Sequence, residues 1–328
     1  MTKLRGDAIK LSMVEIECPI CSCVRRTHYM EAQDHILRAG GTYRIVSCDG
    51  CGLIFLNPRP GVNELADAYG EGYRQWQART VAPTARWLSR LGNIKKLKIV
   101  GGTERGGRLL DIGCGTGEFL REARRAGWDA SGTEVDAGQA EAASDFAGAE
   151  VRHGGLGICG FDEKSFDAVT MWHVLEHLPD PLAELNATKA ILSPDGSLVI
   201  SVPDCASWTA RLFKEYFSGY DAPRHLCDFN RNSIICALEG SGFDVERIFY
   251  RMGTYDCVRQ SLGFLIEDTV RNRCLRIALL AIVNSKPLQI VLQPLASILE
   301  RVGKGAVLTV TAKPCLTRGQ DVPRNGLE

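Results

Sequence analysis

From residue 108 onward, short apolar segments alternate with longer segments that have the periodicity of helices. This alternation predicts strands at 108–113, 128–134, 149–154, 165–172, 197–203, 243–250 and 306–313. It predicts the main helices between them at 117–127, 136–148, 181–196 (closed by a turn) and 231–242. Strands joined by helices pair in parallel and are covered on both faces. The sequence therefore predicts an α/β fold with a mostly parallel sheet and helices on both faces.

A glycine-rich loop joins the first expected strand to its helix. Residues 109–120 read Leu-Leu-Asp-Ile-Gly-Cys-Gly-Thr-Gly-Glu-Phe-Leu. Glycine lets the backbone approach a ligand where a Cβ atom would collide with it, and ligands of open α/β sheets bind at such strand-to-helix turns. Glu118 stands where the dinucleotide fingerprint needs its third glycine, and no Gly-Lys-Ser/Thr of a P-loop follows. The loop is instead G-x-G-x-G, preceded by an acid.

This pattern resembles motif I of the class I S-adenosylmethionine-dependent methyltransferases, which have a Rossmann-like fold. The resemblance implies that the loop holds the methionine part of the cofactor and that Glu134, at the end of the next strand, binds both ribose hydroxyls. The implied cofactor-binding residues are Asp111, Gly113, Cys114, Gly115, Gly117, Glu134, Trp172 and His173. Family members often carry an acid after the third strand that contacts adenine. Gly155 occupies that stretch here, and we leave this contact unassigned.

Two loops that contain histidine follow the fourth and fifth expected strands, at 172–181 and 220–226. The first contains H-x-x-E-H, the spelling of an inverted zincin motif, but it directly follows a strand and Pro179 limits it to about one turn, so a zinc protease is not expected. Both loops resemble those of methyltransferases related to the ubiquinone-biosynthesis O-methyltransferases, where they border methyl donor and acceptor. A hydroxyl acceptor must lose its proton, and histidine titrates near neutral pH. The candidate bases are His177 and His225, followed by His173; for each, a structural role in holding a loop remains an equal alternative.

Four cysteines near the N-terminus form two C-x2-C pairs, Cys18 with Cys21 and Cys48 with Cys51, with 26 residues between the pairs. Zinc favours four thiolates in a tetrahedron, and the intervening segment is long enough for a hairpin. The pattern predicts a zinc ribbon in which Zn²⁺ is structural, because a closed four-thiolate site has no open coordination position. Together with residues 51–60 it resembles methyltransferases that carry a zinc ribbon before the catalytic domain.

The main functional hypothesis is methyl transfer from S-adenosylmethionine to a small-molecule acceptor, with a hydroxyl as the expected nucleophile. A sugar C-methyltransferase is a close variant, although this chain lacks room for the additional C-terminal domain of those enzymes. An RNA base methyltransferase is a second alternative, but residues 1–60 hold eight basic against six acidic residues, and no N/D-P-P-Y/F motif follows the fourth strand. A non-catalytic zinc-ribbon interaction protein is the third, and the intact glycine loop with Glu134 counts against it.

Composition restricts the partners. The 328 residues include 39 Lys and Arg and 39 Asp and Glu, which gives no support to a strongly basic nucleic-acid binder. No secretory signal is recognisable and 13 cysteines are present, so we expect a cytoplasmic protein with reduced thiols. The apolar region 275–299 is interrupted by charges and prolines, which predicts two packed helices rather than a transmembrane segment; a surface facing a membrane or an apolar substrate is the alternative. A homodimer is left open.

Five segments follow from these patterns. We expect a zinc-ribbon module at 1–60, a helical connector at 61–106, the methyltransferase core at 107–250, a helical cap insertion at 251–304, and the last core strand with a tail at 305–328. Within the connector, Trp87, Leu91 and Ile94 recur at helical spacing and predict its apolar face.

Overall fold

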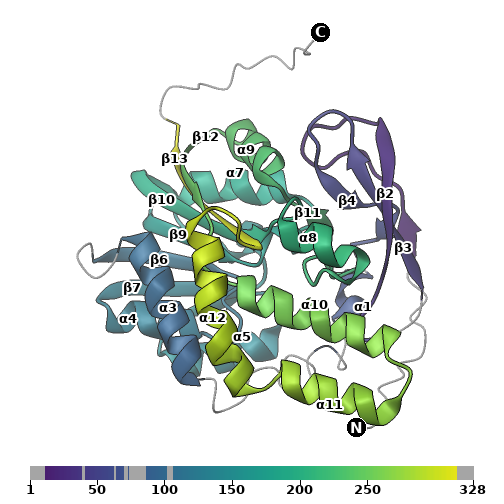
Figure 1. Cartoon of the computed structure of the whole chain (residues 1–328). Coiled ribbons are helices and arrows are strands. Elements are labelled where there is room, and N and C mark those ends of the chain that lie inside the picture. The colour runs from purple at the N-terminus through teal and green to yellow at the C-terminus, as the bar shows by residue number, and fades with distance from the viewer. Residues whose placement is uncertain are drawn as a thin grey trace.

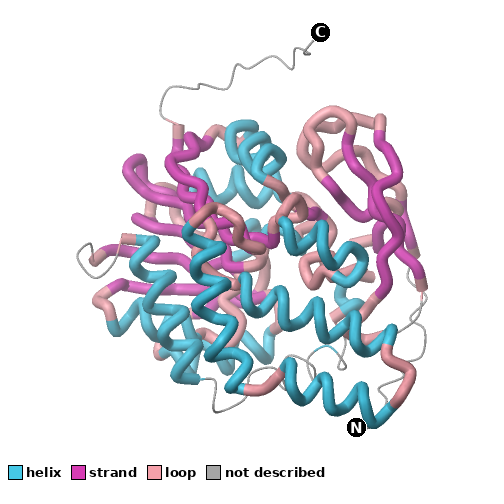
Figure 2. The backbone as a smooth tube through the Cα atoms, in the orientation of Figure 1, coloured by secondary structure: helices cyan, strands magenta, loops and turns pink. Residues whose placement is uncertain are grey.

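The computed structural model describes residues 12–38, 41–62, 64–69, 73, 86–101 and 106–315. Its centre is a seven-stranded sheet in the order β12-β13-β10-β9-β6-β7-β8 (Figures 1 and 2). The strands are β6 (Gly107–Ile112), β7 (Trp128–Glu134), β8 (Val151–His153), β9 (Phe166–Trp172), β10 (Leu192–Pro203), β12 (Phe243–Phe249) and β13 (Val307–Pro314). β6 to β10 pair in parallel, and β13 runs antiparallel to both of its neighbours. The mostly parallel sheet predicted from the sequence is confirmed.

Helices cover both faces of this sheet. α3 (Arg86–Val100), α4 (Glu118–Arg125) and α5 (Ala137–Ala147) form one layer, and α7 (Pro181–Ile191) and α9 (Arg231–Gly240) form the other (Figure 1). The short helix α6 (Leu156–Cys159) follows β8. α5 packs closely because its buried residues Ala140, Ala143 and Ala147 recur at i, i+3 and i+7. Its N-cap Asp136 accepts a hydrogen bond from the Gln139 amide, which satisfies one of the free donors of the first turn.

Two expectations about individual elements were wrong. The strand expected from Ser197 begins earlier, at Leu192, directly after α7 ends at Ile191, because Leu192 is buried and pairs with Phe166 across a bulge. In α3, Leu91 is 40% exposed, and the buried positions are instead Asn93, Leu97 and Val100. The predicted and the buried residues both have helical spacing, and packing against α4 determined which of the two faces is buried. The side chain of Trp87 lies outside the described residues.

The N-terminal cysteine module shares its sheet with the core. β2 (Arg26–Gln33) and β3 (Thr42–Cys48) form the antiparallel hairpin expected between the cysteine pairs. β4 (Ile54–Leu56) extends this sheet, and β11 (Cys227–Asp228), which directly follows the second histidine loop, completes it in the order β11-β4-β3-β2. β1 (Met13–Val14) pairs with β5 (Arg59–Pro60), ahead of α1 (Leu65–Ala68). The module and the second histidine loop are therefore held in one hydrogen-bonded unit.

The segment between β12 and β13 is helical. It consists of α10 (Thr254–Thr269), α11 (Arg273–Val283) and α12 (Lys286–Arg301). α10 packs against the other two helices and against α8 (Trp208–Phe213) and the 3-10 turn η3 (Lys214–Tyr216). A further 3-10 turn, η2 (Leu175–His177), follows β9. Among the described residues, no single helix is long and apolar enough to cross a membrane, although α11 and α12 taken together pass that criterion across a bend of 56°.

Candidate functional site

The glycine loop lies at the carboxyl end of β6, where it turns into α4. A Cβ atom at Gly113 would lie 2.7 Å from Cγ2 of Val174, so this glycine is required by the close approach of the loop after β9. Gly115 has φ of +55°, and a Cβ atom there would have no neighbour within 4 Å. Gly117 is the N-cap of α4. Of the three glycines, Gly115 is therefore the one that faces open space, where a ligand can approach the backbone.

Glu134 ends β7 beside this open position. Its Oε2 atom accepts a hydrogen bond of 3.0 Å from the Gly115 amide, and its Oε1 atom accepts one of 3.2 Å from the Asp136 amide. Each carboxylate oxygen can accept more than one hydrogen bond. The two amides therefore orient the carboxylate and leave acceptor capacity on both oxygens, which is the arrangement that a pair of neighbouring hydroxyls requires.

Asp111 is buried at the end of β6. Its Oδ1 atom accepts a 2.6 Å hydrogen bond from the Thr170 hydroxyl on β9. Burial raises the pKa of Asp111 to about 7, although the hydrogen bond from Thr170 and the charge of Lys96 act in the opposite direction. Lys96 belongs to α3, and its Nζ atom lies 4.8 Å from the centre of the Trp172 ring. The sequence analysis missed Lys96, because the spacing of residues along a helix does not show which side chains of the core a lysine will contact.

Two other predicted cofactor residues differ in how they are placed. The Cys114 side chain is buried in the core cluster formed by α3, α4 and α5, and burial raises the pKa of its thiol. Any role of Cys114 toward a ligand therefore belongs to its backbone. The Trp172 ring packs edge-on against Phe119, with ring centres 5.5 Å apart, and its buried Nε1–H has no hydrogen-bond partner among the described residues. A buried donor of this kind is uncommon in a native fold.

The stretch after the third strand, which was left unassigned, is now located. His153 ends β8, and its Nε2 atom lies 3.1 Å from the Val135 carbonyl. Gly155 is the N-cap of α6, and Leu156 is buried. The side chains of this stretch are thus used to hold the turn.

The first histidine loop is built around a buried carboxylate. Glu176 is only 1% exposed; its Oε1 atom lies 3.2 Å from Nδ1 of His173, and its Oε2 atom has no hydrogen-bond partner among the described residues. Burial by itself would raise the pKa of Glu176, but the hydrogen bond and charge of His173 outweigh it, so the pKa is lowered. His173 has φ of +58° and a side chain that is 46% exposed. Glu176 is a further polar residue of the site that the sequence analysis did not single out.

His177 and His225 meet although they belong to different loops. Their ring centres are 4.5 Å apart. One ring nitrogen of His177, one ring nitrogen of His225 and one carboxylate oxygen of Glu176 all lie within 4.8 Å of one another. Nδ1 of His177 is 2.8 Å from the Tyr69 hydroxyl and 3.1 Å from the Arg224 carbonyl, and burial lowers its pKa to about 4. Nδ1 of His225 lies 2.7 Å from the Gly219 carbonyl. By distance, these three residues could also hold a metal ion.

A buried arginine fastens the second loop to the cysteine module. The Arg224 guanidinium is fully buried and forms ion pairs of 2.5 Å with Asp221 and 2.7 Å with Asp34, which follows β2. Burial would raise the pKa of Asp221, but the charge and hydrogen bonds of Arg224 lower it. These contacts of Arg224 are those of a structural tie between the two segments.

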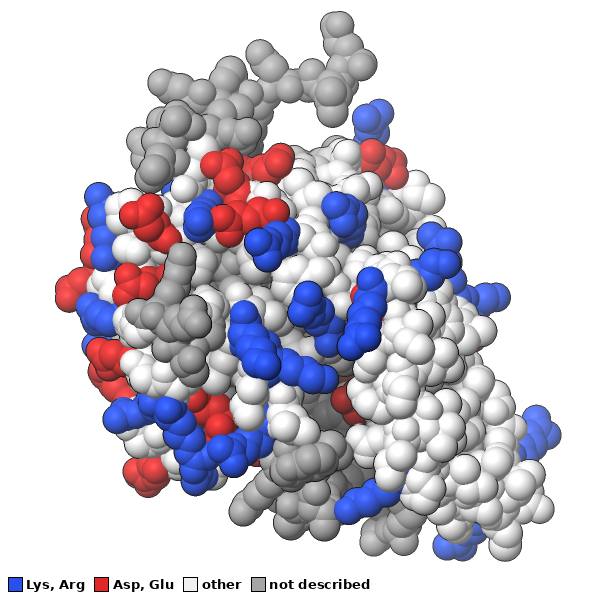
Figure 3. Space-filling view, turned by 60° about the vertical axis from the view of Figure 1, so that its left-hand side comes forward, with Lys and Arg blue, Asp and Glu red and all other residues white. Residues whose placement is uncertain are grey.

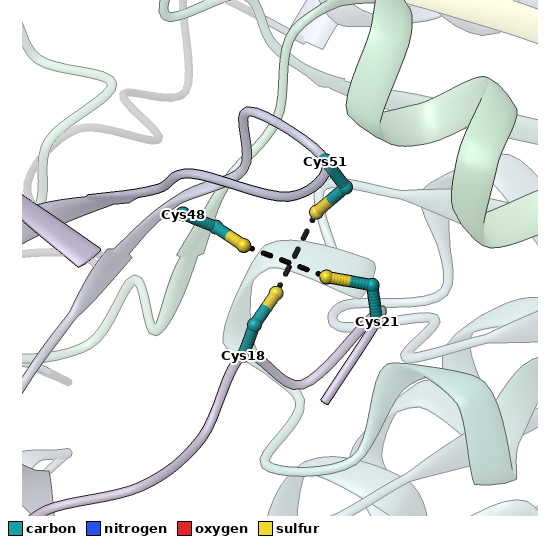
Figure 4. Close-up of side chains that lie close together, drawn as sticks. All are labelled: Cys18, Cys21, Cys48 and Cys51. Atoms are coloured by element: carbon teal, nitrogen blue, oxygen red, sulfur yellow. Dashed lines mark hydrogen bonds between the residues drawn. The ribbon is translucent and has the colours of Figure 1, made fainter. Parts of the chain in front are cut away.

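The four predicted metal ligands converge at the tip of the module (Figure 4). The Sγ atoms of Cys18 and Cys51 are 3.5 Å apart, those of Cys21 and Cys48 are 3.4 Å apart, and all four lie within 4.8 Å of one another. A zinc ion at about 2.3 Å from four sulfurs would separate them by about 3.8 Å, so the cluster fits a ZnS₄ site. The hydrogen bond between Cys18 and Cys51 lowers the pKa of the Cys18 thiol to about 5 and raises the pKa of the Cys51 thiol, so the fit to zinc rests on the distances between the sulfurs.

Two cavities lie away from the glycine loop and the paired histidines. One of about 530 Å³ lies between β2 and the α8–η3 segment, and Tyr29, Arg211 and Tyr220 are among its lining residues. The other, of about 1510 Å³, lies over β10, β12 and β13 between α3 and α12. Neither is lined by the glycine loop or the paired histidines, which lie at the carboxyl ends of the parallel strands.

Comparison with known proteins gives a consistent family. A family model described as a methyltransferase domain matches residues 76–248. The ubiquinone biosynthesis O-methyltransferase of Alkalilimnicola ehrlichii is 30% identical over 142 residues, which cover 38% of this chain and 57% of the relative. The demethylmenaquinone methyltransferase of Staphylococcus epidermidis is 31% identical over 125 residues, covering 36% of this chain and 51% of the relative. The chain thus spans about half the length of these curated relatives.

Solved structures with a similar arrangement are more distant in sequence. A methyltransferase of Thermotoga maritima, described as a possible histamine N-methyltransferase, is 16% identical and superposes with a TM-score of 0.48 over 76% of this chain and 98% of its own.

Proposed function

The chain belongs to the family of methyltransferase domains, whose model matches more than half of its length, and on that premise we propose that it transfers a methyl group from S-adenosylmethionine to a hydroxyl of a small molecule. The observation that carries the proposal is the pairing of the open Gly115 position with the oriented Glu134 carboxylate. Both stand at the carboxyl ends of parallel strands, where open α/β sheets bind their ligands.

The residues of the loop fit the cofactor. Bound S-adenosylmethionine supplies a methyl group on a positively charged sulfur that is open to in-line attack. Glu134 would accept hydrogen bonds from the two ribose hydroxyls, and charge-assisted bonds of this kind contribute about 1.5–3 kcal/mol each. Gly115 would let the methionine part lie against the backbone. Asp111 and Lys96 place an acidic and a basic side chain beside the loop, and their hydrogen-bonding groups suit the ammonium and the carboxylate of an amino acid. Gly113, Gly117, Trp172 and His173 complete the proposed set.

We assign the general base to His225. The Gly219 carbonyl can only accept a hydrogen bond, so Nδ1 of His225 carries the proton and Nε2 of the neutral ring holds a lone pair. That lone pair can take the proton of a hydroxyl acceptor. The buried Glu176 carboxylate, with one oxygen unpartnered among the described residues, can stabilise the imidazolium that results. His177, whose Nδ1 is held by Tyr69 and the Arg224 carbonyl, is assigned to positioning the two loops, and His173 to orienting Glu176.

The choice of oxygen as acceptor rests on two supports. The relative from Alkalilimnicola ehrlichii is named as an O-methyltransferase. The name of the demethylmenaquinone methyltransferase does not say which atom is methylated. A paired histidine and carboxylate also match the need of a hydroxyl for proton removal, which an amine acceptor can meet as its free base. We propose the four cysteines as ligands of a structural Zn²⁺ that orders the module, and Arg224 as the residue that couples this module to the acceptor loop.

The test is a product assay with phenols and catechols as acceptors, in which S-adenosylhomocysteine formation is measured and the methylated position is identified by NMR. We expect His225→Gln to lower kcat by about 10²–10⁴-fold while calorimetric binding of S-adenosylhomocysteine stays unchanged. The matched control is His28→Gln, because the His28 side chain is 57% exposed on β2.

Two outcomes would contradict the assignment. Wild-type kcat in His225→Gln at neutral pH would remove this histidine from catalysis. Methylation of carbon in the product would replace the hydroxyl acceptor by the carbon variant. Failure of the wild-type protein to bind S-adenosylhomocysteine would reject the function as a whole.

A further inference from the structure

α12 presents an apolar stripe to solvent. Ile290, Val291, Leu295, Ile298 and Val302 recur at the spacing of one helix face, and each is between 53% and 72% exposed. The inner side carries a second apolar stripe, in which Ala296 is buried and Leu288, Leu292 and Leu299 are half-buried, together with polar side chains such as Glu300. A helix at the surface of a globular protein normally turns its apolar stripe to the core. α12 has such an inner stripe and, in addition, an exposed apolar stripe on its outer side.

α11 continues this surface. Its inner stripe, Leu279, Leu280 and Val283, is buried or half-buried toward α10, which accounts for its packing. Leu275, Ile277 and Ile282 are nevertheless 49–56% exposed on the remaining faces. Eight exposed large apolar residues on two adjoining helices exceed what scattered surface residues would give. In Figure 3 the lobe at the lower right, to which α11 belongs, is white over most of its surface and has Lys and Arg at its rim.

The segment that contains α11 and α12 is strongly basic. Residues 271–304 contain six cations, Arg271, Arg273, Arg276, Lys286, Arg301 and Lys304, and one acid, Glu300, which is buried. The whole chain has a formal charge of zero, so this surplus is local. None of the six forms an ion pair with another described residue. Exposed apolar stripes flanked by free cations are the composition of helices that lie in a membrane interface.

We propose that the outer face of α11 and α12, defined by Leu275, Ile277, Ile282, Ile290, Val291, Leu295, Ile298 and Val302, docks onto the surface of a membrane that contains anionic lipids. The helices lie on the membrane instead of crossing it: α12, the longer, has 16 residues and measures about 24 Å, less than the hydrocarbon thickness of about 30 Å. Their inner faces pack on α10.

Charge favours lipid over a second copy of the chain as the occupant. A two-fold interface brings the same patch of both copies together, so its cations would face cations. Anionic headgroups neutralise them, at about 1 kcal/mol per Lys or Arg near the surface, which corresponds to about fivefold in affinity for each residue.

Co-sedimentation of the full chain with vesicles tests the proposal. We expect binding to vesicles of phosphatidylcholine mixed with phosphatidylglycerol and little binding to phosphatidylcholine alone. The variant Ile290→Asn/Leu295→Asn should weaken binding by at least about tenfold for each residue. The control Val62→Asn/Leu212→Asn removes two side chains that are 67% and 62% exposed elsewhere, and it should bind as the wild type does.

A second variant keeps every apolar contact. Arg273→Gln/Lys286→Gln/Lys304→Gln should lower the affinity for the anionic vesicles by roughly a hundredfold. All substituted positions are exposed, so folding should be retained and is checked by circular dichroism. Absence of vesicle binding by the folded wild type would overturn the proposal. So would a dimer in sedimentation analysis that Ile290→Asn/Leu295→Asn dissociates, because the same face would then be an interface between two copies.

Discussion

The variant Gly115→Ala tests whether Gly115 is needed for binding the cofactor or only for folding. At Gly115 the new Cβ atom would project into open space, so the cost to folding is restricted to the left-handed backbone, φ of +55°. That conformation costs a residue with a side chain about 1–2 kcal/mol. Because about 1 kcal/mol lowers Tm by roughly 2–4 °C in a domain of this size, we expect a modest fall in Tm.

The cofactor should respond far more strongly. In the proposed site the methionine part occupies the space that the Cβ atom would take, so we expect the calorimetric affinity for S-adenosylhomocysteine to fall by at least about a hundredfold, or about 2.7 kcal/mol. Gly148→Ala is the matched control: Gly148 has φ of +63°, has open space around a built Cβ, and lies at the C-cap of α5. It should show the same loss of Tm and wild-type affinity.

Gly113→Ala completes the comparison. Its Cβ atom would lie 2.7 Å from Val174, so crowding of about 1–3 kcal/mol adds to the backbone cost and the fall in Tm should be the largest of the three. Wild-type affinity in Gly115→Ala, or an equal loss of affinity in Gly148→Ala, would refute the inference that open space at Gly115 exists for the cofactor.

Three further predictions concern stability. Arg224→Met leaves Asp34 and Asp221 buried without their partner, so the free energy of unfolding in urea should fall by about 3–5 kcal/mol; a loss below about 1 kcal/mol would show that the tie is weak. The folded-state pKa of Asp111 is raised from 3.8 to about 7, so protonated Asp111 stabilises the fold below about pH 4 and this contribution is lost as the pH rises through 7. Relative to Asp111→Asn, wild-type stability should therefore fall with a slope of up to about 1.4 kcal/mol per pH unit in that window, and parallel curves would contradict the shift. Metal analysis should find about one zinc per chain, lost in Cys48→Ser together with hydrogen-exchange protection of β2 and β3; a metal-free wild type with a folded module would exclude the site.

Much of the fold could be predicted because its signals are local. Strand and helix periodicities, the glycine loop and the two C-x2-C pairs depend on residues close together in the chain, and they predicted the sheet, the position of Glu134 and the cysteine cluster. The limit appears in α3 and β10. Two faces of α3 have helical spacing, and only packing against α4 determined that Leu97 and Val100 face inward.

Residues from distant segments had no such signal. The sequence by itself determined that His177 and His225 follow two parallel strands, so that they would lie near one sheet edge. Only the tertiary structure decided that their rings meet beside a buried Glu176, that Arg224 forms ion pairs with two carboxylates, and that Lys96 lies over the Trp172 ring. The same holds for the exposed apolar face of α12, since the sequence shows that apolar residues lie on several sides of the helix but not which of them face water. Periodicity depends on neighbours in the chain, whereas side-chain partners depend on how distant elements pack, and a single sequence records only the first.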